Sequence, residues 1–86
     1  MVQPIFVTFI PDQLKQGKLY ISKLFGTAIH LCCCGCGIET ITPLKEGFWQ
    51  LSANGELVSL HPSIGNQDFE CQSHYWIKNN QVRWVG

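Results

Sequence analysis

Residues 32–37 read Cys-Cys-Cys-Gly-Cys-Gly, and residues 71–74 read Cys-Gln-Ser-His. Thiol and imidazole groups packed this closely are typical of a site for a soft divalent cation. Two segments that lie far apart along a chain usually contribute two ligands each to a tetrahedral zinc site. We therefore expect a metal ion, with zinc as the leading candidate, to join the two segments and hold a small β domain closed.

The spacing of the cysteines suggests which side chains bind the metal. Cys71 and His74 are spaced as two ligands on one turn, and Cys34 and Cys36 form the tighter half of the site. Cys32 could replace either cysteine of that half. The predicted metal ligands are drawn from Cys32, Cys34, Cys36, Cys71 and His74. Four sulfur-rich ligands suit iron as well as zinc, so the choice of metal stays open.

Alternation along a predicted strand, residues 27–34, divides its side chains between two faces. Cys33 falls on the face that carries Ile29 and Leu31, so we expect it to be a core residue. His30 shares the other face with the candidate ligands. We expect it to support a metal-bound group or to be buried rather than to be a ligand, although ligation remains an alternative.

Composition limits the remaining possibilities. The chain has 86 residues, 45% of them apolar, with six basic and six acidic residues. A chain this short often needs a metal or a partner to supplement its core. The cations are not clustered, which disfavours nucleic-acid binding. The apolar start lacks a basic segment and is too short to cross a bilayer, so we expect a cytoplasmic protein without membrane contact. An odd number of cysteines in that reducing compartment favours metal binding over disulfides.

Strand-forming residues separated by turn residues predict a mostly β fold. The predicted strands cover residues 5–10, 18–22, 27–34, 38–42, 48–52, 56–60, 75–78 and 81–85. Residues 61–66 are predicted to form an irregular loop. Residues 1–86 are thus expected to form a single zinc-binding β domain, stapled by the metal and built from antiparallel hairpins.

Candidate catalytic residues are few. Ser63 could act as a nucleophile only beside a positioned base, and the sequence alone identifies none, which favours a role in bonding turn backbone. Glu39 and Glu70 are the closest acids to the cysteines, but neither belongs to a His-Glu-x2-His pattern. The sequence thus favours a protein without catalytic residues of its own.

Several motifs resemble those of a family of small bacterial and phage proteins. They are Gly26-Thr27-Ala28-x-His30-Leu31-Cys32-x-Cys34-Gly35-Cys36-Gly37, Thr42-Pro43-Leu44, Trp49, Leu60-x-Pro62-Ser63-Ile64-Gly65-Asn66 and Cys71-x-Ser73-His74-Tyr75-Trp76-Ile77. The resemblance covers about residues 18–84. It implies zinc binding and an accessory role in a bacterial ubiquitin-like conjugation or anti-phage system, because some members are encoded beside conjugation genes. It supplies no catalytic residue.

Three functional hypotheses follow. The leading one is a structural zinc-binding interaction module that docks onto a protein partner. The first alternative is a metal-dependent hydrolase acting on a protein or peptide conjugate, which needs an open position on the ion for water. The second alternative is a thiol redox sensor that uses Cys32, Cys33 and Cys34.

Overall fold

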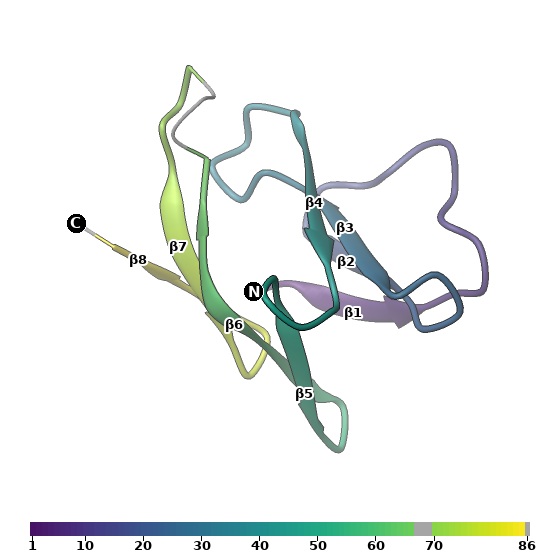
Figure 1. The fold of residues 1–86 in the computed structure, drawn as a ribbon. Helices are drawn as coiled ribbons and strands as arrows, with labels where there is room; N and C mark the ends of the chain where they lie inside the picture. The colour runs from purple at the N-terminus through teal and green to yellow at the C-terminus, as the bar shows by residue number, and fades with distance from the viewer. Residues whose placement is uncertain (67–69, 86) are drawn as a thin grey trace.

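The computed structural model describes residues 1–66 and 70–85, which form two four-stranded sheets (Figure 1). Sheet A contains β1 (Gln3–Phe6), β2 (Lys18–Ser22), β3 (Thr27–Leu31) and β4 (Glu39–Pro43). Sheet B contains β5 (Gln50–Asn54), β6 (Leu57–Gly65), β7 (His74–Lys78) and β8 (Gln81–Trp84). In each sheet the strands lie side by side in chain order. The predicted β fold class is confirmed, and none of the described residues forms a helix able to span a bilayer.

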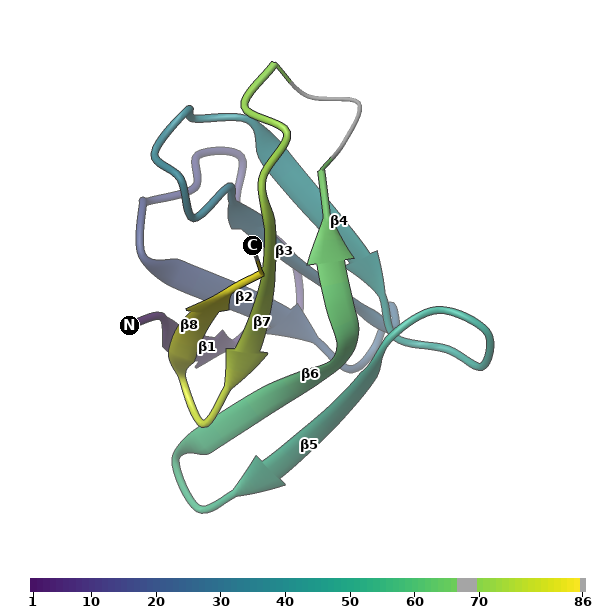
Figure 2. The same ribbon diagram turned by 90° about the vertical axis from the view of Figure 1, so that its left-hand side faces the viewer.

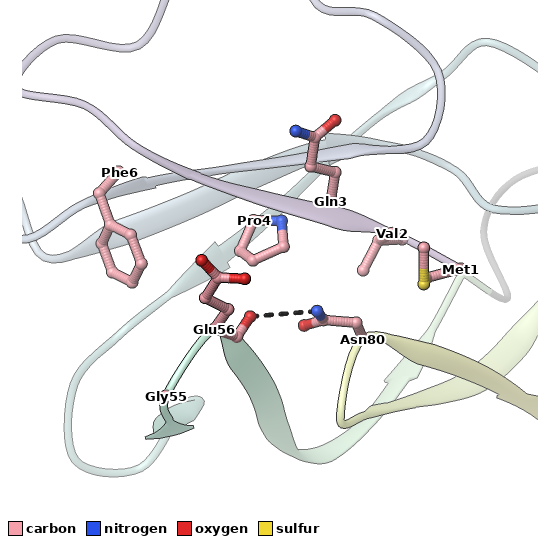
Figure 3. A pocket seen from close by; sticks show the side chains of 8 residues that line it. All are labelled: Met1, Val2, Gln3, Pro4, Phe6, Gly55, Glu56 and Asn80. Carbon is pink, nitrogen blue, oxygen red and sulfur yellow. Dashed lines mark hydrogen bonds between the residues drawn. The ribbon is translucent and has the colours of Figure 1, made fainter.

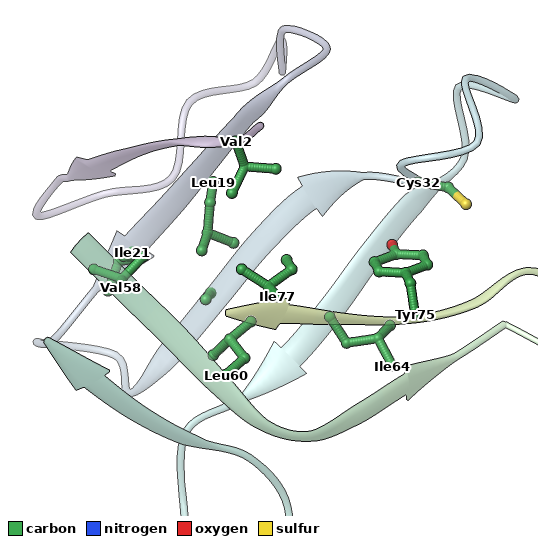
Figure 4. Packing of buried hydrophobic residues seen from close by; sticks show 10 residues of the cluster. Val2, Leu19, Ile21, Cys32, Val58, Leu60, Ile64, Tyr75 and Ile77 are labelled. Atoms are coloured by element: carbon green, nitrogen blue, oxygen red, sulfur yellow. The ribbon is translucent and has the colours of Figure 1, made fainter. Parts of the chain in front are cut away.

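The core lies between the two sheets, and both contribute to it (Figure 4). Sheet A and its flanks supply Val2, Leu19, Ile21, Ala28 and Cys32, whereas sheet B supplies Val58, Leu60, Ile64, Tyr75 and Ile77. Each strand presents alternate residues to this interior because side chains in a strand point to opposite faces. Burying these side chains gives the driving force for packing the sheets together.

The first strands differ from the prediction in several respects. β1 covers Gln3–Phe6 instead of residues 5–10, and it pairs with β2 in parallel, so sheet A is not built of antiparallel hairpins alone. β3 ends at Leu31, before the cysteines. The expected core face of this strand, Ile29, Leu31 and Cys33, is wrong, because these side chains are only half-buried. The fully buried face carries Ala28 and His30, followed by Cys32. Cys33 is only half-buried against the core, because the chain turns away from the sheet at that point.

β6 replaces the irregular loop predicted for residues 61–66. Its register with β7 jumps between Leu60, which faces Ile77, and Ile64, which faces Tyr75. Residues 61–63 of β6 therefore lie opposite Trp76 alone. A bulge of this kind bends a strand and redirects its side chains. Pro62, Ser63 and Gly65, which suggest a loop, belong to a strand distorted in this way, and Asn66 follows its last residue.

The other end of β6 is tied to the N-terminus and to the turn between β7 and β8. The backbone of Asn80 bonds to Val2 and Val58, and its side chain bonds to Val58 N and to the Glu56 carbonyl. A hollow of about 520 Å³ opens beside these contacts, between the start of β1 and the β5–β6 turn (Figure 3). These bonds connect the N-terminal segment to sheet B.

Candidate functional site

Four cysteines meet at one end of the molecule. Cys32, Cys34 and Cys36 come from the loop between β3 and β4, and Cys71 comes from the segment that leads into β7. Figures 1 and 2 show these two segments side by side at the same end of the sheets. All four Sγ atoms lie within 4.8 Å of one another.

The distances between these sulfur atoms suit a tetrahedral metal site. Cys32 Sγ lies 3.4 Å from Cys34 Sγ and 3.8 Å from Cys71 Sγ, and Cys36 Sγ lies 3.8 Å from Cys71 Sγ. Four sulfurs arranged at the usual zinc–sulfur distance of about 2.3 Å would be about 3.8 Å apart. The residues therefore fit a four-cysteine site, in which no fifth ligand is needed.

Polar side chains support the sulfur atoms from the interior. The Ser73 hydroxyl lies 3.0 Å from Cys32 Sγ and 3.4 Å from Cys71 Sγ. The buried Asn66 side chain donates to Cys32 Sγ at 3.4 Å and to Ser73 Oγ at 3.2 Å. Hydrogen bonds to metal-binding groups fix their orientation and tune their basicity.

These hydrogen bonds also favour the thiolate form that binds metals. The Ser73 hydroxyl and its backbone N–H lower the pKa of Cys71 to about 6. Burial opposes ionisation of Cys32, but hydrogen bonds involving Ser73 and Cys34 outweigh burial and lower the pKa of that thiol. Two sulfurs that come from distant parts of the chain are thus both prepared for ligation.

Beside the cysteines, β6 and β7 bring a serine and a histidine together. Ser63 Oγ lies 2.7 Å from Nε2 of His74, and both side chains are half-buried. Gly65 of β6 lies opposite His74 of β7, so Ser63 is the diagonal neighbour of the imidazole on the outer face of sheet B. In the tautomer whose Nε2 carries no proton, the Ser63 hydroxyl donates to the ring. The described residues supply no hydrogen-bond partner for Nδ1.

The outer face next to this pair is aromatic and basic. The ring of Trp76 lies 5.5 Å from the ring of His61, and Lys78 Nζ lies 4.8 Å from the Trp76 ring centroid. Arg83 of β8 lies opposite Trp76 in the register. The bulge places Ser63 beside this group of side chains.

His30 of β3 lies in the interior. His30 Nε2 is 2.7 Å from the Tyr75 hydroxyl, which also accepts the Cys33 N–H at 3.4 Å. Burial lowers the pKa of His30 to about 4, so its ring is neutral. Its Nδ1 is buried without a partner among the described residues. His30 thus lies outside the group of four sulfurs and packs against the strand that carries His74.

The structure gathers four of the five predicted ligands and places the fifth elsewhere. The four cysteines form the sulfur group, whereas Nε2 of His74 is bonded to Ser63. The sequence alone does not pair Ser63 with His74, because the loop expected at residues 61–66 conceals their register. One feature indicates that the two side chains share a face. Ser63 precedes the buried Ile64 and His74 precedes the buried Tyr75, so Ser63 and His74 both point to the outer face of their strands.

Comparisons with curated proteins and with solved structures found no match. A family model described as "bacterial ubiquitination-like system serine protease (BubE)" matches residues 6–85. Those residues include nearly all of both sheets, the four cysteines and the Ser63–His74 pair. The association with a bacterial ubiquitin-like conjugation system, expected from the sequence, is confirmed at the level of the family. Membership of such a system indicates protein partners. The chain belongs to the BubE family of bacterial ubiquitination-like systems.

Proposed function

We propose that this protein is a serine peptidase of a bacterial ubiquitination-like system, with Ser63 as nucleophile and His74 as general base. The observation that carries the proposal is the 2.7 Å contact between Ser63 Oγ and His74 Nε2. A serine hydroxyl is a weak nucleophile until an adjacent base can accept its proton. The description of the matching family, a serine protease, agrees with this chemistry.

The geometry suggests how the pair would act. His74 Nε2 accepts the proton as Ser63 Oγ attacks the carbonyl carbon of the substrate, forming a tetrahedral intermediate. The protonated imidazole then donates that proton to the leaving amine, and the C–N bond breaks to give an acyl-Ser63 ester. Water, deprotonated by the same nitrogen, attacks the ester and releases the acid and free Ser63.

The four cysteines support a structural zinc site within the same proposal. Cys32, Cys34, Cys36 and Cys71 would hold the ion, which supplies a crosslink between two distant segments. Four thiolates occupy every position of a tetrahedral ion, and this favours a structural role over the activation of water. The crosslink would fix Ser73 and Asn66, whose chain neighbours are His74 and Gly65. Cys32 and Cys71, held by a bound ion, would therefore help to keep β6 and β7 in the register that the Ser63–His74 pair requires.

The substrate class follows from the family. Members are described as serine proteases of a bacterial ubiquitination-like system, so a peptide or isopeptide bond in a protein of that system is the proposed target. The aromatic and basic side chains beside Ser63 offer a surface for a protein substrate (Trp76, Lys78 and Arg83).

A fluorophosphonate probe tests the nucleophile directly, because it forms a covalent bond with an activated serine. The purified zinc-loaded protein should gain one adduct by intact mass, and peptide mapping should place that adduct on Ser63. Ser63→Ala should abolish labelling, His74→Gln should slow it by at least about 100-fold, and Ser59→Ala, a change elsewhere on β6, should not affect it. A folded wild-type protein without an adduct on Ser63 would refute the proposal.

A further inference from the structure

The strand that carries the nucleophile has an open edge. β5 pairs with β6 only as far as Gln50, which lies opposite His61. Beyond that point the chain of β5 turns toward sheet A, since Trp49 N bonds to the Pro43 carbonyl. Among the described residues, no strand pairs with the edge of β6 from Pro62 to Gly65 that faces away from β7. Pro62 and Gly65 are both exposed.

The register shows which backbone groups lie along this edge. The N–H and C=O groups of successive residues point to alternate sides of a strand. Asn66 N–H donates to the Ser73 carbonyl at 2.7 Å and so points toward the chain that leads into β7. The polar groups of Gly65, one residue earlier and outside the bulge, therefore point to the open side. Unpaired groups of this kind can accept another strand.

Gly65 leaves the space beside the catalytic pair free. A Cβ atom at this position would meet only the His74 ring, with Cδ2 at 3.9 Å. That separation is an ordinary contact, so the fold does not require glycine at position 65 for lack of room. A larger side chain would, however, stand on the outer face beside Ser63 and His74.

We propose that the peptide segment to be cleaved binds as an additional strand along the open edge of β6, passing Gly65 with its scissile carbonyl at Ser63. This inference rests on the proposed peptidase function and adds how the substrate is held. Strand addition provides main-chain hydrogen bonds that do not depend on sequence, and it holds alternate side chains on one face. The substrate would therefore be an extended tail or linker rather than a folded surface loop.

Backbone methylation of a cleaved peptide tests the proposal. A quenched fluorescent peptide library gives a cleaved sequence, and each of its amides near the cleaved bond is then N-methylated in turn. Each methyl group that removes a bond to the edge of β6 should lower kcat/KM by about 10-fold, close to the value of one hydrogen bond. Along the peptide, positions at which methylation lowers kcat/KM should alternate with positions at which it has no effect. A uniform response, or none, would overturn strand addition.

Substitution of Gly65 provides a second test. Gly65→Ala and Gly65→Val should lower kcat/KM for the peptide progressively, and by a larger factor than they lower the rate of phosphonate labelling. Ala53→Val is a matched control, because Ala53 is exposed on β5 of the same sheet, away from the open edge. Equal kcat/KM for Gly65→Val and wild type would overturn the proposal. Absence of labelling at Ser63 in the wild type would instead count against the peptidase function itself.

Discussion

The four-cysteine group and the Ser63–His74 pair are neighbours that depend on the fold in different ways. Three of the four cysteines come from five consecutive positions, so much of the sulfur group forms locally. The proposed catalytic pair needs two strands in one register, with a bulge at Ser63. The candidate metal ligands can thus be recognised in the sequence because three of them are closely spaced. The Ser63–His74 pair becomes visible only when the pairing of β6 with β7 is known.

The largest expected effect comes from removing the metal site, which should disrupt both regions together. Structural zinc contributes about 10–16 kcal/mol in small domains, which is as large as or larger than the net stability of a typical domain, about 5–15 kcal/mol. Cys71→Ala, or a strong chelator, should therefore unfold the protein, as measured by circular dichroism and metal analysis. Cys33→Ser is the control, because Cys33 lies outside the four-sulfur group. A folded Cys71→Ala protein that retains one equivalent of zinc would show that the site is assigned wrongly.

Substitutions in the proposed catalytic pair should abolish hydrolysis without affecting metal binding. Ser63→Ala should reduce peptide hydrolysis by about 1000-fold or more while the protein still binds one equivalent of zinc. His74→Gln should reduce hydrolysis in the same way, because the general base is lost.

The zinc content of His74→Gln also tests the ligand set predicted from the sequence. Full occupancy, measured by elemental analysis, would exclude His74 as a required ligand. Loss of the metal would mean that His74 belongs to the metal site and that the two regions are not distinct.

Acid should destabilise the fold through the buried His30. Its pKa falls from 6.5 to about 4 on folding, so the unfolded chain binds the proton first as the pH decreases. Stability is therefore full above about pH 6.5 and declines toward pH 4, by about 3 kcal/mol from this residue. Denaturant unfolding of zinc-loaded wild type and His30→Gln across this range should show the decline in the wild type and a smaller decline in the variant. Parallel pH profiles would contradict the neutral, buried state of His30.

The smallest effect is expected from Asn66, whose side chain supports the sulfur group. Asn66→Ala removes the donor to Cys32 Sγ and to Ser73 Oγ. Loss of such a supporting bond typically lowers metal affinity by about 10–100-fold, which competition with a chromophoric chelator can measure. Asn54→Ala, on exposed β5, is the control. Unchanged affinity would show that Asn66 does not support the sulfur group.

The elements that could be predicted are hairpins, whose strands and turn residues are adjacent in the sequence. The final hairpin, predicted at residues 75–78 and 81–85, is confirmed as His74–Lys78 and Gln81–Trp84. The hairpin predicted around Asn54-Gly55 is also present, but β5 lies two residues later than predicted, and β6 starts one residue later and continues to Gly65. The strand predicted for residues 27–34 is too long, because Gly35 and Gly37 adopt positive φ in a tight loop that begins at the cysteines.

The β class and the crowding of Cys32, Cys34 and Cys36 follow from the amino-acid sequence, because alternation, turn residues and closely spaced thiols act over a few residues, whereas the tertiary fold brings Cys71 to that group. The role of His74 depends on the tertiary fold. Its partner is set by the register of β6 against β7, and that register includes a bulge that no local pattern indicates. Side-chain period fixes which face a residue occupies, but the neighbour it meets there depends on how two distant strands align.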